Sequence, residues 1–367
     1  MWVVSVDSPP LTVTGGRGTV DRTNKRPRVA VGLGRVYRMA MHGMQGFFLL
    51  WLAAGCLAAS AADAPIFPSE LVDFGPVSRD PLFAGGGPQA WDRDLRERGW
   101  IMREGNCWHL WYTGSNADRS PLRQVGYATG SDGLNWRRCE SNPLVRDAWV
   151  EDMCIIRQGG CLWMFAEGAG DIAHLLASTD RLHWQRRGPL DIRLASGLPI
   201  PDGPRGTPAA WLENGVWHLF YERMDLGVWL ATSRDLRTFR NVSDEPVLAC
   251  GPDAYDRAKI AVDQIVRHRG RYYAYYHACA LERGGEWSTC IATSDDLVHW
   301  VKYAANPILP VDPDHPQRSS AMLVSDGSRH RLYTTHPDVR VRFSVTPLWS
   351  GPAMAPETAT GARCPVR

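Results

Sequence analysis

Short stretches of alternating hydrophobic and polar residues, separated by turns, recur along the chain at a nearly constant spacing. One pattern occurs four times: an apolar strand, an aromatic-rich strand, a third strand ending in small residues, and then an Asp followed by a closing aromatic. The closing aromatics are Trp136, Trp184, Phe239 and Trp300, at spacings of 48, 55 and 61 residues. A period near fifty residues that is filled with short strands is typical of four-stranded propeller blades.

The same pattern predicts how the ring of blades closes. A fifth, degenerate copy runs from Ser320 to Val345, and residues 65–83 are expected to supply its missing outer strand. The predicted fold class is therefore all-β, a five-bladed β-propeller forming a single domain over 65–367. Its blades are expected at 91–145, 149–190, 205–248, 255–309 and 318–348. The alternative, an all-β sandwich, gives no reason for four copies of one blade pattern.

The N-terminal residues 1–62 have the pattern of a targeting segment. Arg35 and Arg38 precede an apolar stretch over 46–59, and a small-x-small cleavage pattern follows at 59–61. The stretch is short for a membrane span, so cleavage is favoured over a transmembrane anchor, and residues before Met39 are interpreted as an upstream misassigned start. A secreted or periplasmic protein is expected. The alternative is a lipid anchor at Cys56 in the cell envelope, because residues 52–56 loosely resemble a lipoprotein box.

Composition narrows the class of partner. A net charge of +2 gives no electrostatic case for nucleic acid. The sixteen tryptophans suit both the packing of sheets and stacking on sugar rings. Eight cysteines remain after the targeting segment, and Cys279 and Cys290, which flank a short hairpin loop, are the first candidates for a disulfide.

Propeller geometry predicts where functional side chains gather. The first strand of each blade begins at one mouth of the central channel, and the second strand ends there, so both sets of positions converge on one pocket. Polar residues occupy these positions in every blade: Arg98, Glu151, Asp152, Arg205, Thr207, Asp263, Arg318 and Ser319 before the first strands, and Thr113, Glu167, Glu222, His277 and His336 after the second.

The motif Ser131-Asp132-Gly133 with Trp136, together with the Asn-Pro-Leu and Asn-Pro-Ile elements, resembles the sugar-cleaving five-bladed propellers of glycoside hydrolase families 43, 32, 68, 117 and 130. The resemblance covers residues from about Pro65 to the C-terminus. For family 43 it implies a base Asp in blade one, an Asp in blade two that tunes a pKa, and an acid Glu in blade three. Asp152 matches the second of these, whereas the chain has Arg98-Gly99 and Arg205-Gly206-Thr207 at the other two positions.

Glycoside cleavage needs two carboxyl groups on either side of the scissile bond, one protonated and one ionised. Glu222 is the candidate proton donor and Asp263 the candidate base, with their roles exchangeable, and Asp152 completes the catalytic set. Residues around them are expected to bind the substrate: Arg98, Glu151, Glu167, Arg205, His277, Arg318 and His336. The three arginines alternatively pair with neighbouring acids, or bind an anionic ligand.

The sequence therefore predicts a glycoside hydrolase acting on an oligosaccharide or polysaccharide. Two alternatives stay open: a glycoside phosphorylase of the family 130 kind, and a non-catalytic carbohydrate-binding propeller. No cofactor is expected to be required, and no Cys/His spacing indicates zinc. A structural Ca²⁺ ion in the central channel is left as an alternative.

Overall fold

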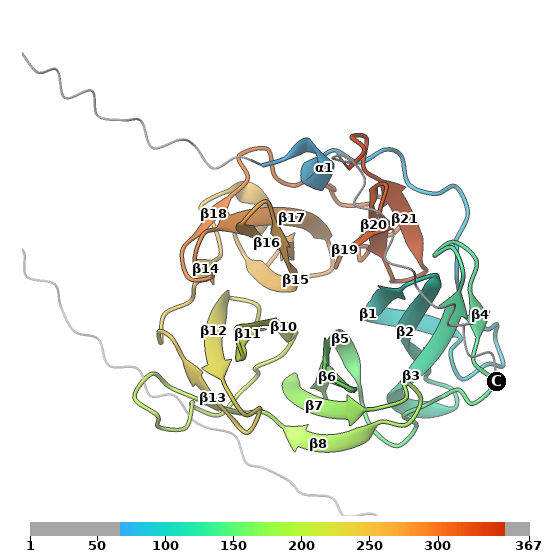
Figure 1. The fold of residues 1–367 in the computed structure, drawn as a ribbon, viewed down its shortest axis with the longest axis horizontal. Helices are drawn as coiled ribbons and strands as arrows, with labels where there is room; N and C mark the ends of the chain where they lie inside the picture. Colours follow the sequence, from blue (N-terminus) through green and yellow to red (C-terminus); the bar gives the residue numbers. More distant parts are fainter. Residues whose placement is uncertain (1–66, 349–367) are drawn as a thin grey trace, which may run out of the picture. The chain divides into compact units, whose positions relative to one another are not determined.

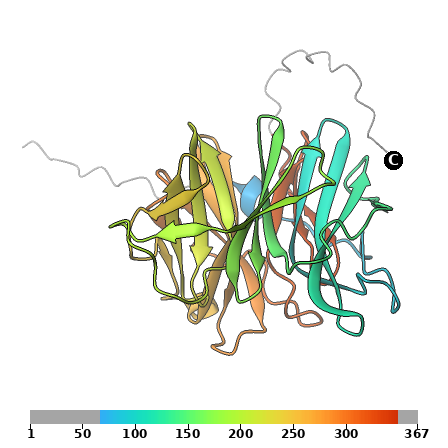
Figure 2. The ribbon, with the colours of Figure 1, turned by 90° about the horizontal axis from the view of Figure 1, so that it is seen from below.

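The computed structural model describes residues 67–348, whose regular secondary structure is almost entirely β-strand. Five separate, mainly antiparallel sheets surround a central axis, which confirms the five-bladed β-propeller (Figure 1). Seen from the side, the strands of each sheet run between the two faces of the propeller (Figure 2). The expected targeting segment and Cys56 lie outside the described residues. Between residues 67 and 348, no helix is long and apolar enough to cross a membrane.

The strands of blades one and two lie within the expected boundaries, whereas blade three extends beyond its expected range of 205–248 because it includes β9 and the end of β14. Blade one contains β1 (Asp94–Glu104), β2 (Cys107–Asn116), β3 (Ser120–Gly130) and β4 (Arg137–Arg138). Blade two contains β5 (Glu151–Gln158), β6 (Cys161–Gly168), β7 (Ile172–Ser178) and β8 (Gln185–Pro189). Blade three contains β10 (Ala209–Glu213), β11 (Val216–Glu222), β12 (Gly227–Ser233) and β13 (Thr238–Asn241), with β9 (Asp191–Arg193) parallel to β13 and β14 (Leu248–Ala249) beside β12.

Blades four and five complete the ring. Blade four contains β15 (Lys259–His268), β16 (Arg271–Cys279), β17 (Trp287–Ser294) and β18 (Trp300–Lys302). Blade five contains β19 (Met322–Ser325), β20 (His330–Thr334) and β21 (Arg340–Phe343). The two helical turns are α1 (Ser69–Val72) and the 3₁₀ turn η1 (Ala254–Asp256). Each innermost strand contacts the innermost strands of both neighbouring blades, including β19 with β1, so the circle is closed.

The outer strand of blade five comes from the start of the described chain, as the sequence predicts. Phe74 pairs with Ser344 and Phe83 with Val339. Backbone hydrogen bonds continue this pairing, with Gly75 N–H donating to Phe343 O and Ser78 N–H to Val341 O, both at 2.9 Å. The segment therefore covers the edge that β21 would otherwise expose.

The repeated Asp and closing aromatic have distinct structural roles. Asp180 caps its turn by accepting from the backbone N–H groups of Leu182 and His183, and Asp132, Asp235 and Asp296 do the same in their blades. The closing aromatic then packs edge-on against the second strand of the preceding blade. These pairs are Trp184 on Trp111, Phe239 on Phe165 and Trp300 on Phe220. The repeat is thus the interface between consecutive blades.

The expected disulfide between Cys279 and Cys290 is absent, because both thiols are free. In the β16–β17 ladder Cys279 lies opposite Trp287, and Cys290 lies opposite Tyr276. The two cysteines therefore lie at different levels of the hairpin, three pairs apart. Each is fully buried and behaves as a small apolar side chain.

Candidate active site

The inner strands of the blades begin with irregular backbone at the same face of the propeller. Bulges in β1, β5 and β15 leave Glu97, Asp152 and Asp263 without a ladder partner. Glu97 and Asp152 have positive φ values of 47° and 46°, as do Thr207 at 43° and Ser320 at 53°. Non-glycine residues rarely adopt this conformation, and it concentrates at functional sites.

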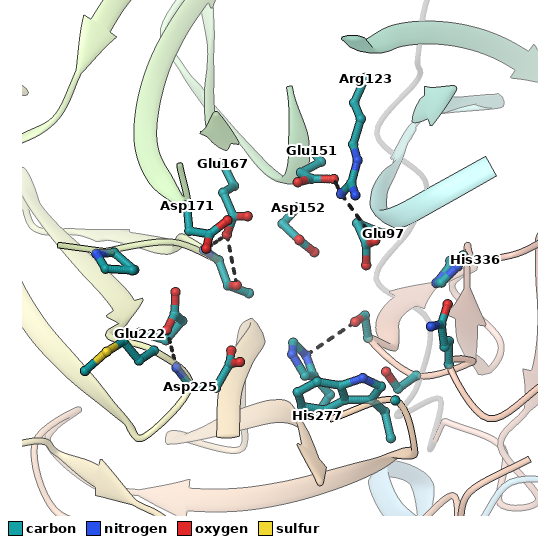
Figure 3. A pocket seen from close by; sticks show the side chains of 18 of the residues that line it. Glu97, Arg123, Glu151, Asp152, Glu167, Asp171, Glu222, Asp225, His277 and His336 are labelled. Atoms are coloured by element: carbon teal, nitrogen blue, oxygen red, sulfur yellow. Dashed lines mark hydrogen bonds and ion pairs between the residues drawn. The ribbon is translucent and has the colours of Figure 1, made fainter. Parts of the chain in front are cut away.

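All four positive-φ residues line one cavity of about 320 Å³ at the centre of this face. Its wall is strongly acidic (Figure 3). Seven carboxylates contribute to it: Glu97, Glu151, Asp152, Glu167, Asp171, Glu222 and Asp225. Two tryptophans, Trp149 and Trp287, and two histidines, His277 and His336, complete most of the lining.

Two glutamates from adjacent blades are held by consecutive backbone amides. Gly206 N–H donates to Glu222 Oε1 at 2.9 Å, and Thr207 N–H donates to Glu167 Oε2 at 2.7 Å. Burial, followed by the charge of Asp225, raises the pKa of Glu222 to about 7. Burial and the charge of Asp152 raise the pKa of Glu167 as well. These two side chains therefore tend to keep their protons.

The opposite wall carries carboxylates that are paired with guanidinium groups. Glu97 forms ion pairs with Arg96 at 3.0 Å and Arg123 at 3.4 Å, and its side chain is 29% exposed. Arg123 also pairs with Glu151, which accepts a hydrogen bond from Trp149 at 2.7 Å. Of the two carboxylates on this wall, Glu97 is the more exposed, and it contacts an arginine on each of two sides.

Asp152 lies between these two walls (Figure 3). Its Oδ1 accepts from the Arg98 backbone N–H at 3.1 Å. Burial, together with the charge of Glu97, raises the pKa of Asp152, although the nearby charges of Arg98 and His277 partly oppose this. Asp152 is therefore placed to couple the protonation of the two walls.

Asp263 does not reach the cavity wall where the sequence places it. It is fully buried, and its Oδ1 accepts from His277 Nδ1 at 2.7 Å, so the histidine stands between Asp263 and the cavity. Burial by itself lowers the pKa of His277, but the charge and hydrogen bond of Asp263 outweigh it and the pKa is raised. Trp287 packs edge-on against the His277 ring at 4.9 Å. His336 lines the cavity as expected.

Arg98 also lies below the cavity rather than in its wall. Its side chain is completely buried and donates to five backbone carbonyls, those of Asp152, Met153, Pro208, Val262 and Asp263. These oxygens from blades two, three and four converge on the guanidinium, which leaves them unavailable to a Ca²⁺ ion. Within residues 67–348 no group of three or more His, Cys, Asp or Glu side chains has the arrangement of a metal site.

The other two predicted arginines are placed elsewhere. The backbone of Arg205 pairs with Ile172 between blades two and three, and Arg205 is not among the cavity-lining residues. Arg318 forms buried ion pairs with Asp338 at 2.8 Å and Asp312 at 3.1 Å. The structure thus brings together Asp152, Glu222, Glu151, Glu167, His277 and His336, and leaves Asp263, Arg98, Arg205 and Arg318 outside the wall.

Several lining residues escaped the sequence analysis. Glu97 was passed over because the bulge in β1 moves the cavity position one residue before Arg98. Asp171 and Asp225 lie in the turns after β6 and β11, a few residues beyond Glu167 and Glu222. Carboxylates recurring after the second strand of two consecutive blades are a signal that could have identified them.

Comparisons of the sequence with known proteins identify distant relatives. No family model matches the chain. An uncharacterised protein of Mycobacterium tuberculosis (strain CDC 1551 / Oshkosh) is 24% identical over 228 residues, which cover 57% of this chain and 75% of that protein. A 1,2-β-oligomannan phosphorylase of Thermoanaerobacter sp. (strain X514) is 22% identical over 171 residues, covering 43% of this chain and 53% of the phosphorylase.

Solved structures share the five-bladed arrangement. A glycosyl hydrolase from Bacteroides ovatus superposes with a TM-score of 0.56 and 14% identity, covering 69% of this chain and 84% of that one. A β-1,2-mannobiose phosphorylase from Listeria innocua superposes with a TM-score of 0.53 and 15% identity, covering 68% and 89%. The chain therefore has the propeller fold found in glycosidases and glycoside phosphorylases.

Proposed function

We propose that the protein is a glycoside hydrolase that cleaves oligosaccharides in the central cavity. The observation that carries the proposal is the division of this acidic cavity into two walls. One wall holds Glu222, with a pKa raised to about 7, and the other holds Glu97 in ion pairs with Arg96 and Arg123. A group that retains its proton and a carboxylate anion in one cavity are the two kinds of group that glycoside cleavage requires.

The proposed roles follow from the two walls. Glu222 donates its proton to the glycosidic oxygen as the bond to the anomeric carbon breaks. Glu97 accepts a proton from a water molecule, whose oxygen forms the new bond to that carbon, and proton exchange with solvent restores both groups. Asp152 lies between them, and its charge favours the protonated state of Glu167. In this scheme Glu97 takes the role of base that the sequence assigned to Asp263.

Phosphorolysis is the second candidate, and it is favoured by the names of two of the similar proteins. It would require an inorganic phosphate next to the anomeric carbon. Among the described residues that line the cavity, Arg123 is the single Arg or Lys, and it is already paired with Glu97 and Glu151. The carboxylates of the cavity that remain ionised repel a phosphate dianion, so the charge of the cavity supports water as the acceptor.

A single assay series tests the proposal. The protein is incubated with a panel of aryl glycosides and oligosaccharides, with and without inorganic phosphate, and free sugars and sugar phosphates are quantified. We expect free sugars at a rate independent of phosphate, and a loss of about 10²- to 10⁴-fold in kcat for Glu222→Gln and Glu97→Gln. Phosphate-dependent release of a sugar phosphate would replace hydrolysis with phosphorolysis. If the protein binds sugars but converts none of them, it is a non-catalytic carbohydrate-binding propeller.

A further inference from the structure

A second cavity of about 390 Å³ adjoins the candidate active site. Gly285, Gln317 and His336 line both cavities, so the two are immediate neighbours. The second cavity lies between the start of β1 and the loops that precede β19 and follow β20. Nothing in the proposed cleavage step uses it.

Ion pairs of a buried arginine hold one wall of this second cavity in place. Arg318, whose side chain is 6% exposed, joins Asp312 and Asp338 and so fixes the loop over 312–318. Trp287 N–H donates to Pro316 O at 2.8 Å, which attaches the same loop to the β16–β17 hairpin. Arg318, expected from the sequence to bind substrate, therefore stabilises the wall of the second cavity.

The lining has the mixed chemistry that sugar recognition requires. Arg93, Arg96, Asp94 and Asp314 present hydrogen-bond donors and acceptors, and Leu95, Pro316 and Pro337 present apolar surface. Sugar rings offer hydroxyl groups and C–H faces to such mixed walls. The volume also falls within the range of about 300–1,000 Å³ that is common for small-molecule sites.

The position of the second cavity indicates which part of a substrate it receives. In Figure 3, Glu222 lies on the side of the active-site cavity away from Glu97 and His336. The leaving group must lie next to the proton donor, whereas His336 marks the junction with the second cavity. The sugar beyond this junction therefore belongs to the part of the substrate that bears the anomeric carbon.

We infer that the second cavity is a sugar-binding subsite for an extended glycone, so that the enzyme prefers to release a disaccharide or a longer fragment over a single sugar. This inference rests on the proposed glycosidase function. It names the substrate class of the same site as an oligosaccharide with at least two sugars on the anomeric side of the cleaved bond.

The test compares aryl glycosides that carry the same aryl leaving group and either one or two sugars. The leaving group is the same in both substrates. The kcat/KM value of the two-sugar glycoside divided by that of the one-sugar glycoside therefore reports the contribution of the second sugar alone. We expect a ratio of about ten or more for the wild type and a decrease of about tenfold in the ratio for His315→Trp, which places bulk in the second cavity. Arg93→Met, which removes hydrogen-bond donors there, should lower the ratio in the same direction.

His299→Trp is the matched control, because it introduces the same side chain at an exposed histidine in the β17–β18 turn, remote from both cavities. Its ratio should equal that of the wild type. A wild-type ratio near one, or a ratio unaffected by both His315→Trp and Arg93→Met, would overturn the subsite while leaving the glycosidase function intact. Absence of hydrolysis of every glycoside by the wild type would instead overturn the function itself.

Discussion

Burial and the charges beside each group determine which carboxyl groups of the cavity keep their protons. Glu222 and Glu167 have each lost solvent through burial, and each receives only backbone or hydroxyl hydrogen bonds in place of an arginine. Glu97, in contrast, contacts two guanidinium groups. All three residues are glutamates with the same intrinsic pKa. The difference between a proton donor and an anion therefore arises from the surroundings of each side chain.

The pKa of Glu222 gives a pH dependence of activity. A proton donor must be protonated, and burial followed by the charge of Asp225 raises its pKa to about 7. We expect kcat/KM to fall by about tenfold per pH unit above pH 7. The measurement is a pH–rate profile of the wild type beside Glu222→Gln, whose residual activity should lack this limb. If the activity of the variant still falls above pH 7, another acid must be the proton donor, and Glu167 is the first candidate.

Asp263 is predicted to act through His277. Its carboxylate is fully buried and lies 2.7 Å from His277 Nδ1, so Asp263→Asn removes the negative charge that favours the imidazolium form. We expect the pKa of His277 to fall, because the largest contribution that opposes burial is then removed and only the charges of Asp152 and Asp225 remain to oppose it. An NMR titration of the imidazole measures this directly.

Asp296→Asn is the control for that titration, since it removes a carboxylate that lies 2.7 Å from an exposed histidine, His299, elsewhere in the same blade. The titration of His277 should be unaffected by it. An unchanged pKa of His277 in Asp263→Asn would show that the buried carboxylate does not set its charge.

At the scale of elements, the repeat allowed the blades to be predicted but not the course of the backbone at their inner ends. Alternating apolar positions and closing aromatics specify strands and blade interfaces, because packing between neighbouring sheets depends on them. A bulge changes the direction of a side chain by one residue, and the hydrophobic pattern contains no sign of it. Asp263 was therefore assigned to the wall and Glu97 was missed, whereas Asp152 was placed correctly by blade geometry.

The segment between blades two and three offers an element-scale prediction. A Cβ atom on Gly206 would collide with the Glu167 carboxylate and lie 2.8 Å from Glu222 Oε1. Gly206→Ala should therefore displace both side chains, lowering kcat/KM by about 10²-fold or more and stability by about 1–3 kcal/mol. Gly160→Ala, in the β5–β6 turn with no atom within 4 Å of the added carbon, serves as the control. Full activity of Gly206→Ala would argue against catalysis by this pair of glutamates.

At the scale of the whole propeller, stability depends on the segment that completes blade five. Ser78 N–H donates to the carbonyl of Val341, a buried residue of β21. Ser78→Pro removes this donor and leaves the carbonyl unsatisfied, which should cost about 1–3 kcal/mol. Thermal unfolding of Ser78→Pro and Ser78→Ala measures the effect. The alanine variant keeps the backbone N–H and loses only the 3.4 Å hydrogen bond that Ser78 Oγ accepts from Val341 N–H, so it should be destabilised less than the proline variant. Equal midpoints for all three proteins would contradict closure through this pairing.

The acidic cavity also makes the stability of the whole propeller depend on pH. The pKa values of Asp152, Glu167 and Glu222 are all raised in the folded protein, chiefly by burial, so the folded state binds more protons than the unfolded chain above the ordinary carboxyl range. Linkage then requires these three groups to lower the free energy of unfolding as pH rises, and their stabilisation is present at pH 4–5 and is lost as pH passes through about 7 and above. Histidines whose pKa is lowered by burial, such as His109 and His330, act in the opposite direction, but only up to about pH 6.5. Urea unfolding at a series of pH values from about 7 to 9 therefore isolates the decrease. Glu167→Gln, which cannot ionise, should flatten the dependence, and a wild-type stability that stays constant or rises over this range would show that these carboxyl groups are already ionised in the folded protein.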